Sequence, residues 1–88
     1  MKEHINYKAL DVKVVPLSEL QANDYNPNRM PDTEMDLLRE SITKYGFLFP
    51  IITTWDAKEE KYRIIDGYHR YETLRRMNAE DASIIDLN

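Results

Sequence analysis

The segment YRIIDGYHRYETLRR, residues 62–76, constrains the fold of this chain more than any other stretch. A β-branched apolar run ends at Asp66-Gly67, and a basic run rich in helix-forming Arg, Glu and Leu begins at once. We therefore expect a strand over 61–65 to stop at Gly67 and a helix to follow over 68–77. Such a junction brings together backbone N–H groups that have no partner within the helix. We therefore regard this turn as the first candidate for a functional site.

The residues before this junction predict a hairpin and another helix. The run PIITTW, 50–55, and the strand over 61–65 flank the charged turn DAKEEK, which is the pattern of a β-hairpin. Upstream, Asp32 or Thr33 can cap a helix that ends at Gly46. The apolar residues of that helix repeat at three- and four-residue spacing, with one more beside the stripe: Met35, Leu38, Ile42, Tyr45 and Leu37.

The two ends of the chain complete the predicted order of elements. We expect residues 1–11 to form a flexible tail, and DVKVVPL to be a strand that buries Val12 and Val14 and stops at Pro16. SEL reads as one helical turn, QANDYNPNRMPD as a loop and ASIIDLN as a closing strand. The order predicts one α+β domain over 12–88, a short mixed sheet with two main helices.

Composition excludes several classes of function. The 88 residues permit one domain, and no apolar run approaches the ~20 residues of a membrane span. The absence of cysteine excludes a disulfide framework, a thiolate nucleophile and a Cys-ligated zinc site. We expect a cytoplasmic protein without membrane contact, and leave open that the chain is the N-terminal part of a longer protein.

Charge is unevenly distributed along the chain. A formal net charge of −4 argues against a protein that binds nucleic acid with its entire surface. The segment 61–77 is different, because five Lys and Arg residues stand against two carboxylates, a local charge of +3. The segment is either a solvated helix face or an anion pocket on an acidic body.

The residues after Gly67 favour an anion pocket. His69 and Arg70 would lie in the first helical turn, where cations are unfavourable unless an anion balances them. Gly67 allows close approach of the backbone, Arg70 can fork onto two phosphate oxygens, and His69 can donate or transfer a proton near neutral pH. The alternative is that Gly67 only turns the chain and that His69 and Arg70 pair with local carboxylates such as Asp66.

Two further segments bear on the same site. The sequence Asn26-Pro27-Asn28-Arg29 predicts a rigid turn that carries another arginine and amide side chains. The loop YGFLFP, 45–50, places Phe47 and Phe49 at the end of a predicted helix. These rings are either part of the core or a platform for a nucleotide base beside the anion site.

Together, "VPLSEL…NPNR", "LLRESITKYGFLFPIIT" and "IIDGYHRYETLRR" resemble the N-terminal domain of ParB-type partition proteins, and more widely the ParB/sulfiredoxin-like fold, over about residues 12–87. The resemblance implies a nucleotide whose phosphates bind at the glycine–helix turn: CTP in ParB proteins, ATP in sulfiredoxins and ADP in free-serine kinases. The residues that it assigns to the phosphate or nucleotide site are Gly67, Tyr68, His69, Arg70, Arg29, Asn26, Gly46, Phe47 and Pro50.

Departures from each relative limit what carries over. Tyr68 stands where sulfiredoxins have cysteine, so sulfinic acid reduction by that route is excluded. ParB proteins usually have Glu-Arg-Arg after the glycine, whereas DGYHR is closer to the DGHHR of free-serine kinases. ParB proteins also carry a helix-turn-helix domain for which this chain has no room. DNA is therefore expected only indirectly or through a missing C-terminal domain.

Three functions remain open at this point. The first is a ParB-like regulatory or DNA-metabolism domain that binds CTP or ATP/ADP, with Mg²⁺ on the phosphates, and that could form a homodimer. The second is a small-molecule phosphotransferase or slow nucleotide hydrolase, with His69 as the catalytic candidate and Glu19 and Asp24 as other bases. The third is a ligand-free module for protein or DNA interaction. We expect no confident metal ligand from the protein, although Asp66 could help to hold the ion.

Overall fold

The computed structural model describes residues 2–5, 10–22, 31–47 and 49–88. Along the chain, the elements are β1 (Lys13–Pro16), the 3₁₀ turn η1 (Leu17–Glu19), β2 (Leu20–Gln21), α1 (Asp32–Tyr45), β3 (Ile51–Asp56), β4 (Lys61–Asp66), α2 (Tyr68–Arg76) and β5 (Asp81–Asp86). Within the described ranges, no helix is long and apolar enough to cross a membrane.

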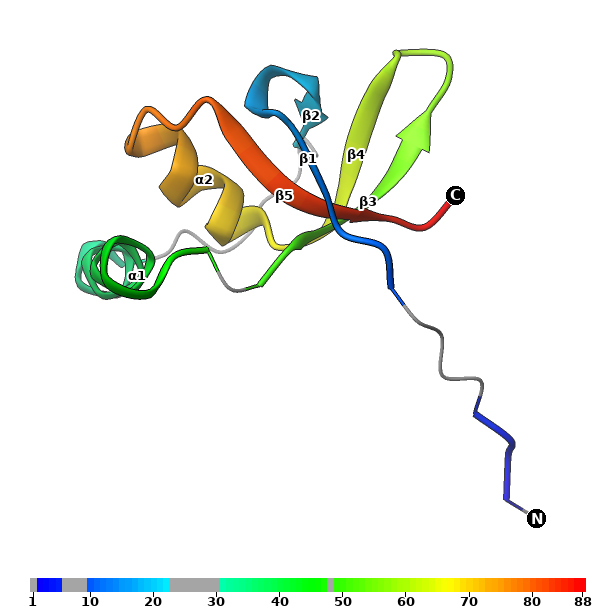
Figure 1. The fold of residues 1–88 in the computed structure, drawn as a ribbon, viewed down its shortest axis with the longest axis horizontal. Coiled ribbons are helices and arrows are strands. Elements are labelled where there is room, and N and C mark those ends of the chain that lie inside the picture. Colours follow the sequence, from blue (N-terminus) through cyan, green and yellow to red (C-terminus); the bar gives the residue numbers. More distant parts are fainter. Residues whose placement is uncertain (1, 6–9, 23–30, 48) are drawn as a thin grey trace.

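The strands form one mixed, five-stranded sheet in the order β1-β5-β3-β4-β2. The hairpin partners β3 and β4 are antiparallel, as are β1 and β5, whereas β5 runs parallel to β3 and β2 runs parallel to β4. Helix α2 links β4 to β5 and packs beside the sheet, and α1 lies against α2 (Figure 1). This architecture confirms the predicted α+β class with two main helices.

The sheet curls on itself. Lys13 of β1 donates a hydrogen bond from Nζ to the Tyr62 hydroxyl of β4 at 2.9 Å, although β5 and β3 lie between the two strands in the sheet order. Apolar side chains from every strand and from α2 fill the concave side. The buried members of this core are Val15, Leu20, Ile51, Ile64, Leu74, Ala82 and Ile84.

The face of β1 differs from the prediction. Val12 and Val14 are exposed, and Val15 is the buried residue of this strand. The register with β5 gives the reason, because Val15 lies opposite the buried Ala82 and Val14 lies opposite Ser83 on the other side of the sheet. The alternation of Val12 and Val14 with the charged Asp11 and Lys13 predicts an apolar face that is one residue out of step with the observed face.

Helix α1 confirms the predicted element and corrects its details. The N-cap residue is Pro31 rather than Asp32 or Thr33, and Asp32 is the first helical residue. Its apolar stripe is narrower than predicted, since Met35 is buried whereas Leu37 and Tyr45 are exposed. Strand β2 was not predicted, because two residues are too few to show a period.

We expect the concave core to carry most of the stability of the domain. The side chain of Ile51, on the central strand β3, is 0% exposed, whereas that of Ile65, on the neighbouring strand β4, is 55% exposed. Ile51→Ala should lower the free energy of unfolding by about 2–5 kcal/mol, and Ile65→Ala by less than about 1 kcal/mol. Urea denaturation followed by circular dichroism measures both. Equal losses would contradict the assignment of the two faces.

The end of α2 should make stability dependent on pH. Glu72 accepts hydrogen bonds from Arg75 and Arg76, and these bonds hold the pKa of its carboxyl below its ordinary value of 4.5. A lowered pKa contributes stability that is present above the unfolded-state pKa and is lost as pH falls through the folded-state pKa. The difference in unfolding free energy between the wild type and Glu72→Gln should therefore be largest near neutral pH. It should shrink below about pH 4.5, and a difference that is constant from pH 7 to pH 3 would contradict this.

Candidate functional site

The turn between β4 and α2 has the geometry of an open helix N-terminus. Gly67 adopts the left-handed conformation, with φ +105° and ψ +24°, and thereby reverses the chain directly after Asp66. Helical hydrogen bonding begins with the Tyr71 N–H, which donates to the Gly67 carbonyl at 2.9 Å. The N–H groups of the first helical residues therefore have no acceptor within the helix, and Gly67 has no side chain that could cap them.

Arg70 folds back from the helix over this turn. Its Nη2 lies 2.9 Å from the position that a Cβ on Gly67 would occupy, and its Nε lies 3.0 Å from it. The guanidinium also pairs with Asp66 Oδ2, but the distance is 3.8 Å, and the Asp66 side chain is largely in solvent. Arg70 therefore does pair with Asp66, as the alternative interpretation expected, but the ion pair is long and the guanidinium lies over Gly67.

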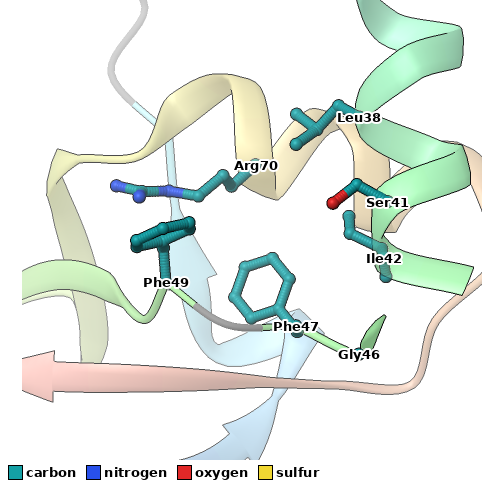
Figure 2. A pocket seen from close by; sticks show the side chains of 7 residues that line it. All are labelled: Leu38, Ser41, Ile42, Gly46, Phe47, Phe49 and Arg70. Carbon is teal, nitrogen blue, oxygen red and sulfur yellow. The ribbon is translucent and has the colours of Figure 1, made fainter. Parts of the chain in front are cut away.

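An apolar pocket adjoins Arg70. Its volume is about 50 Å³, and Figure 2 shows how the end of α1, the loop after it and the Arg70 side chain surround it. The lining residues are Leu38, Ser41, Ile42, Gly46, Phe47, Phe49 and Arg70. The structure therefore places Gly46 and Phe47 next to Arg70. Phe47 is half-buried and packs against the core, whereas Phe49 is exposed.

Thr73 connects the turn to α1, and the sequence did not single it out. Its buried hydroxyl lies 2.8 Å from the His69 carbonyl and 2.8 Å from Met35 Sδ. The hydroxyl has one hydrogen, and the carbonyl is the stronger acceptor. The only available signal was the spacing, since Thr73 follows His69 by four residues, as in back-bonding of threonine within a helix.

The remaining expected site residues have different surroundings. Tyr68 is half-buried at the start of α2, and its ring is 6.0 Å from the His69 ring and 6.2 Å from the Tyr71 ring. Pro50 is half-buried just before β3. Asn26 and Arg29 lie outside the described residues, as does Asp24 among the candidate bases. Their place in the site stays a prediction.

The described part of the chain contains no group of three or more His, Asp or Glu residues that could hold a metal ion. Asp66 is the one carboxylate that the ion pair places at the Gly67 turn.

The fold and this turn define a domain of the ParB/sulfiredoxin-like fold. Sulfiredoxin from Arabidopsis thaliana shares the fold with a TM-score of 0.75 at 18% identity, over 86% of this chain and 83% of that chain. The profile of the family described as "ParB N-terminal domain" matches residues 1–85. The chain belongs to the ParB N-terminal domain family.

Individual relatives show which parts of larger proteins correspond to this chain. YbdM, an uncharacterized protein of Escherichia coli strain K12, is 46% identical over 55 residues, which are 62% of this chain and 26% of YbdM. C-terminally truncated ParB from Caulobacter crescentus complexed with CTP-γ-S has a TM-score of 0.75 at 24% identity, over 86% of this chain and 43% of that chain. A free serine kinase in complex with AMP has a TM-score of 0.76 at 26% identity, over 100% of this chain and 35% of that chain. This chain thus spans less than half the length of these three proteins.

The two glycines allow a matched test of the turn. Gly67 and Gly46 both have positive φ, so alanine at either position should cost about 1–3 kcal/mol of stability. A Cβ at Gly67 would also meet the Arg70 guanidinium, whereas nothing lies within 4 Å of a Cβ at Gly46. Gly67→Ala should therefore shift the Arg70 Nε–H resonance in NMR spectra, and Gly46→Ala should not. Equal shifts would contradict the close approach of Arg70 to the turn.

Proposed function

We propose that this chain is a nucleotide-binding domain that holds the phosphates of a CTP- or ATP-type nucleotide at the turn between β4 and α2. The observation that carries the proposal is the combination, at Gly67, of a helix N-terminus whose N-cap residue has no side chain and a guanidinium folded over it. Backbone N–H groups and the helix dipole favour a phosphate at such an end, and arginine can bind two of its oxygens.

Charge in the first turn of α2 supports this assignment. The residues from Tyr68 to Tyr71 include no acidic side chain, although acidic residues are the favourable choice at a helix N-terminus. Instead, His69 and Arg70 occupy the turn. A bound polyphosphate would balance both the dipole and the guanidinium, and would replace the long contact with Asp66.

The comparisons support the same class of ligand. The similar Caulobacter ParB is a chromosome-partitioning protein complexed with a CTP analogue, and the similar free serine kinase is complexed with AMP or ADP. In our proposal, Mg²⁺ binds mainly through the phosphates, and Asn26 and Arg29 complete the site. The domain acts in regulation or DNA metabolism in the cytoplasm, and a homodimer and a DNA contact through another domain are compatible with it.

Phosphotransfer to a small molecule is the second candidate function. The similarity to the free serine kinase favours it, because that match extends over 100% of this chain at 26% identity. Asp66 immediately precedes Gly67 and His69 follows it by two residues, and they could hold an ion or accept a proton. Glu19, the other described candidate base, is exposed in η1. Release of ADP or AMP in the presence of candidate acceptors, lost in His69→Ala, would favour this function over binding alone.

A thermal-shift screen tests the nucleotide site directly. CTP, ATP, ADP, AMP and GTP are each added with and without Mg²⁺. A ligand at one hundred times its dissociation constant should stabilise the domain by about 2.7 kcal/mol, which for this size raises Tm by roughly 10–20 °C. If no nucleotide shifts Tm, and calorimetry also detects no binding, the nucleotide function is wrong and an interaction module remains.

Two arginines of α2 provide the matched mutations. Arg70→Gln removes the guanidinium over Gly67, and Arg76→Gln removes the same charge at the other end of the helix, beside Glu72. Arg70→Gln should weaken nucleotide binding about 10- to 100-fold, since a hydrogen bond to a charged group contributes about 1.5–3 kcal/mol. Arg76→Gln should change the dissociation constant less than about twofold. Equal effects in calorimetric titrations would show that only net charge matters.

A further inference from the structure

Arg70 is the best covered of the arginines that form ion pairs in the described chain. Its side chain is 23% exposed, compared with 48%, 56% and 39% for Arg63, Arg75 and Arg76. It also has the longest ion pair, 3.8 Å to Asp66, because the other three lie between 2.5 and 3.3 Å from their carboxylates. The ion partner therefore does not account for the covering of Arg70, and other groups must hold the side chain in place.

The pocket beside Arg70 shows which groups these are. Arg70 forms one wall, and the phenyl rings of Phe47 and Phe49 form others. Its volume of about 50 Å³ has room for a few water molecules rather than for a nucleobase. The interior of the pocket therefore does not enclose a base, and the two rings and the arginine side chain border the same small space.

Phe49 is the ring that meets the charged end of the arginine. Figure 2 shows the guanidinium on the Phe49 side of the pocket that both residues line, with the aliphatic stem of Arg70 running back toward the helix. Planar guanidinium groups stack on aromatic faces, and the stem gains from apolar cover. Phe49 is 65% exposed, so core packing does not explain a phenylalanine at this position.

We propose that Phe49 is a positioning residue that holds the Arg70 guanidinium over Gly67, ready to bind phosphate. The proposal rests on the proposed nucleotide function and concerns the polyphosphate part of the ligand, whatever its base. The guanidinium lies 3.8 Å from Asp66 Oδ2, and in this role the Phe49 ring holds it back from direct contact with that carboxylate. Without the ring, Arg70 is free to approach the Asp66 carboxylate, which competes with phosphate for the same donors.

Calorimetric titrations with CTP, ATP and inorganic tripolyphosphate test this role. Phe49→Leu should weaken binding of all three ligands by the same factor, about 2- to 5-fold, and Phe49→Tyr should restore it. Tyr45→Leu is the matched control, because Tyr45 is an exposed aromatic residue nearby that does not line the pocket. In an Arg70→Gln background, Phe49→Leu should have no further effect on affinity, because the two residues act as one unit.

The outcomes separate this proposal from the nucleotide function. Weaker binding of CTP or ATP, with unchanged affinity for tripolyphosphate, would show that Phe49 stacks on the base and would overturn the positioning role. Unchanged affinities in Phe49→Leu would overturn it while the nucleotide function stands. Failure of the wild type to bind any of the three ligands would overturn the proposed function, and the positioning role with it.

A measurement without ligand provides a further check. In NMR spectra of the free protein, stacking on Phe49 should shift the Arg70 δ-methylene protons upfield through the ring current. The shift should disappear in Phe49→Leu and persist in Phe49→Tyr and Tyr45→Leu. The absence of such a shift in the wild type would overturn the positioning role even if nucleotides bind.

Discussion

The left-handed conformation of Gly67 is the constraint on which the candidate site depends. It ends β4 and starts α2 within a single residue, so the first N–H groups of the helix emerge at the end of a sheet strand. It also leaves the space that the Arg70 guanidinium occupies, because a Cβ there would lie 2.9 Å from Nη2. Backbone donors and a cation thus meet at one point because one residue lacks a side chain.

The packing around the turn keeps these groups in place. Leu74 of α2 is buried in the concave core of the sheet. The neighbouring Thr73 contacts Met35 of α1, and its hydroxyl lies within hydrogen-bond distance of the His69 carbonyl in its own helix. Helix α2 is therefore fixed on two sides, by the sheet and by α1. The loop after α1 then brings Phe47 and Phe49 to the Arg70 side chain, so that α1 also contributes to the surroundings of the turn.

The sequence predicted the elements better than it predicted their faces. The hairpin, both helices and the junction at Gly67 can be predicted locally, because glycine and proline end elements and β-branched residues favour strands. The structure confirms these elements. The inward residue of β1 could not be predicted in this way, because it depends on register with β5, a strand far away in the sequence. The proximity of Phe49 to Arg70 likewise depends on how α1 and its loop pack against α2. Segment resemblance supplied the family, and the contribution of Asn26 and Arg29 stays a prediction.

The position of β5 has a consequence for how the domain is made. This strand lies between β1 and β3, where Ile84 pairs with Lys13 on one side and with Ile51 on the other. Strand β1 comes first among the strands in chain order and β5 comes last. The pairing of β1 with β5 therefore cannot form until β5 has been synthesised. During synthesis on the ribosome, β1 cannot be joined to β3 through the sheet until β5 has left the exit tunnel. Assembly of the complete sheet is therefore a late event that depends on contacts between residues far apart in sequence.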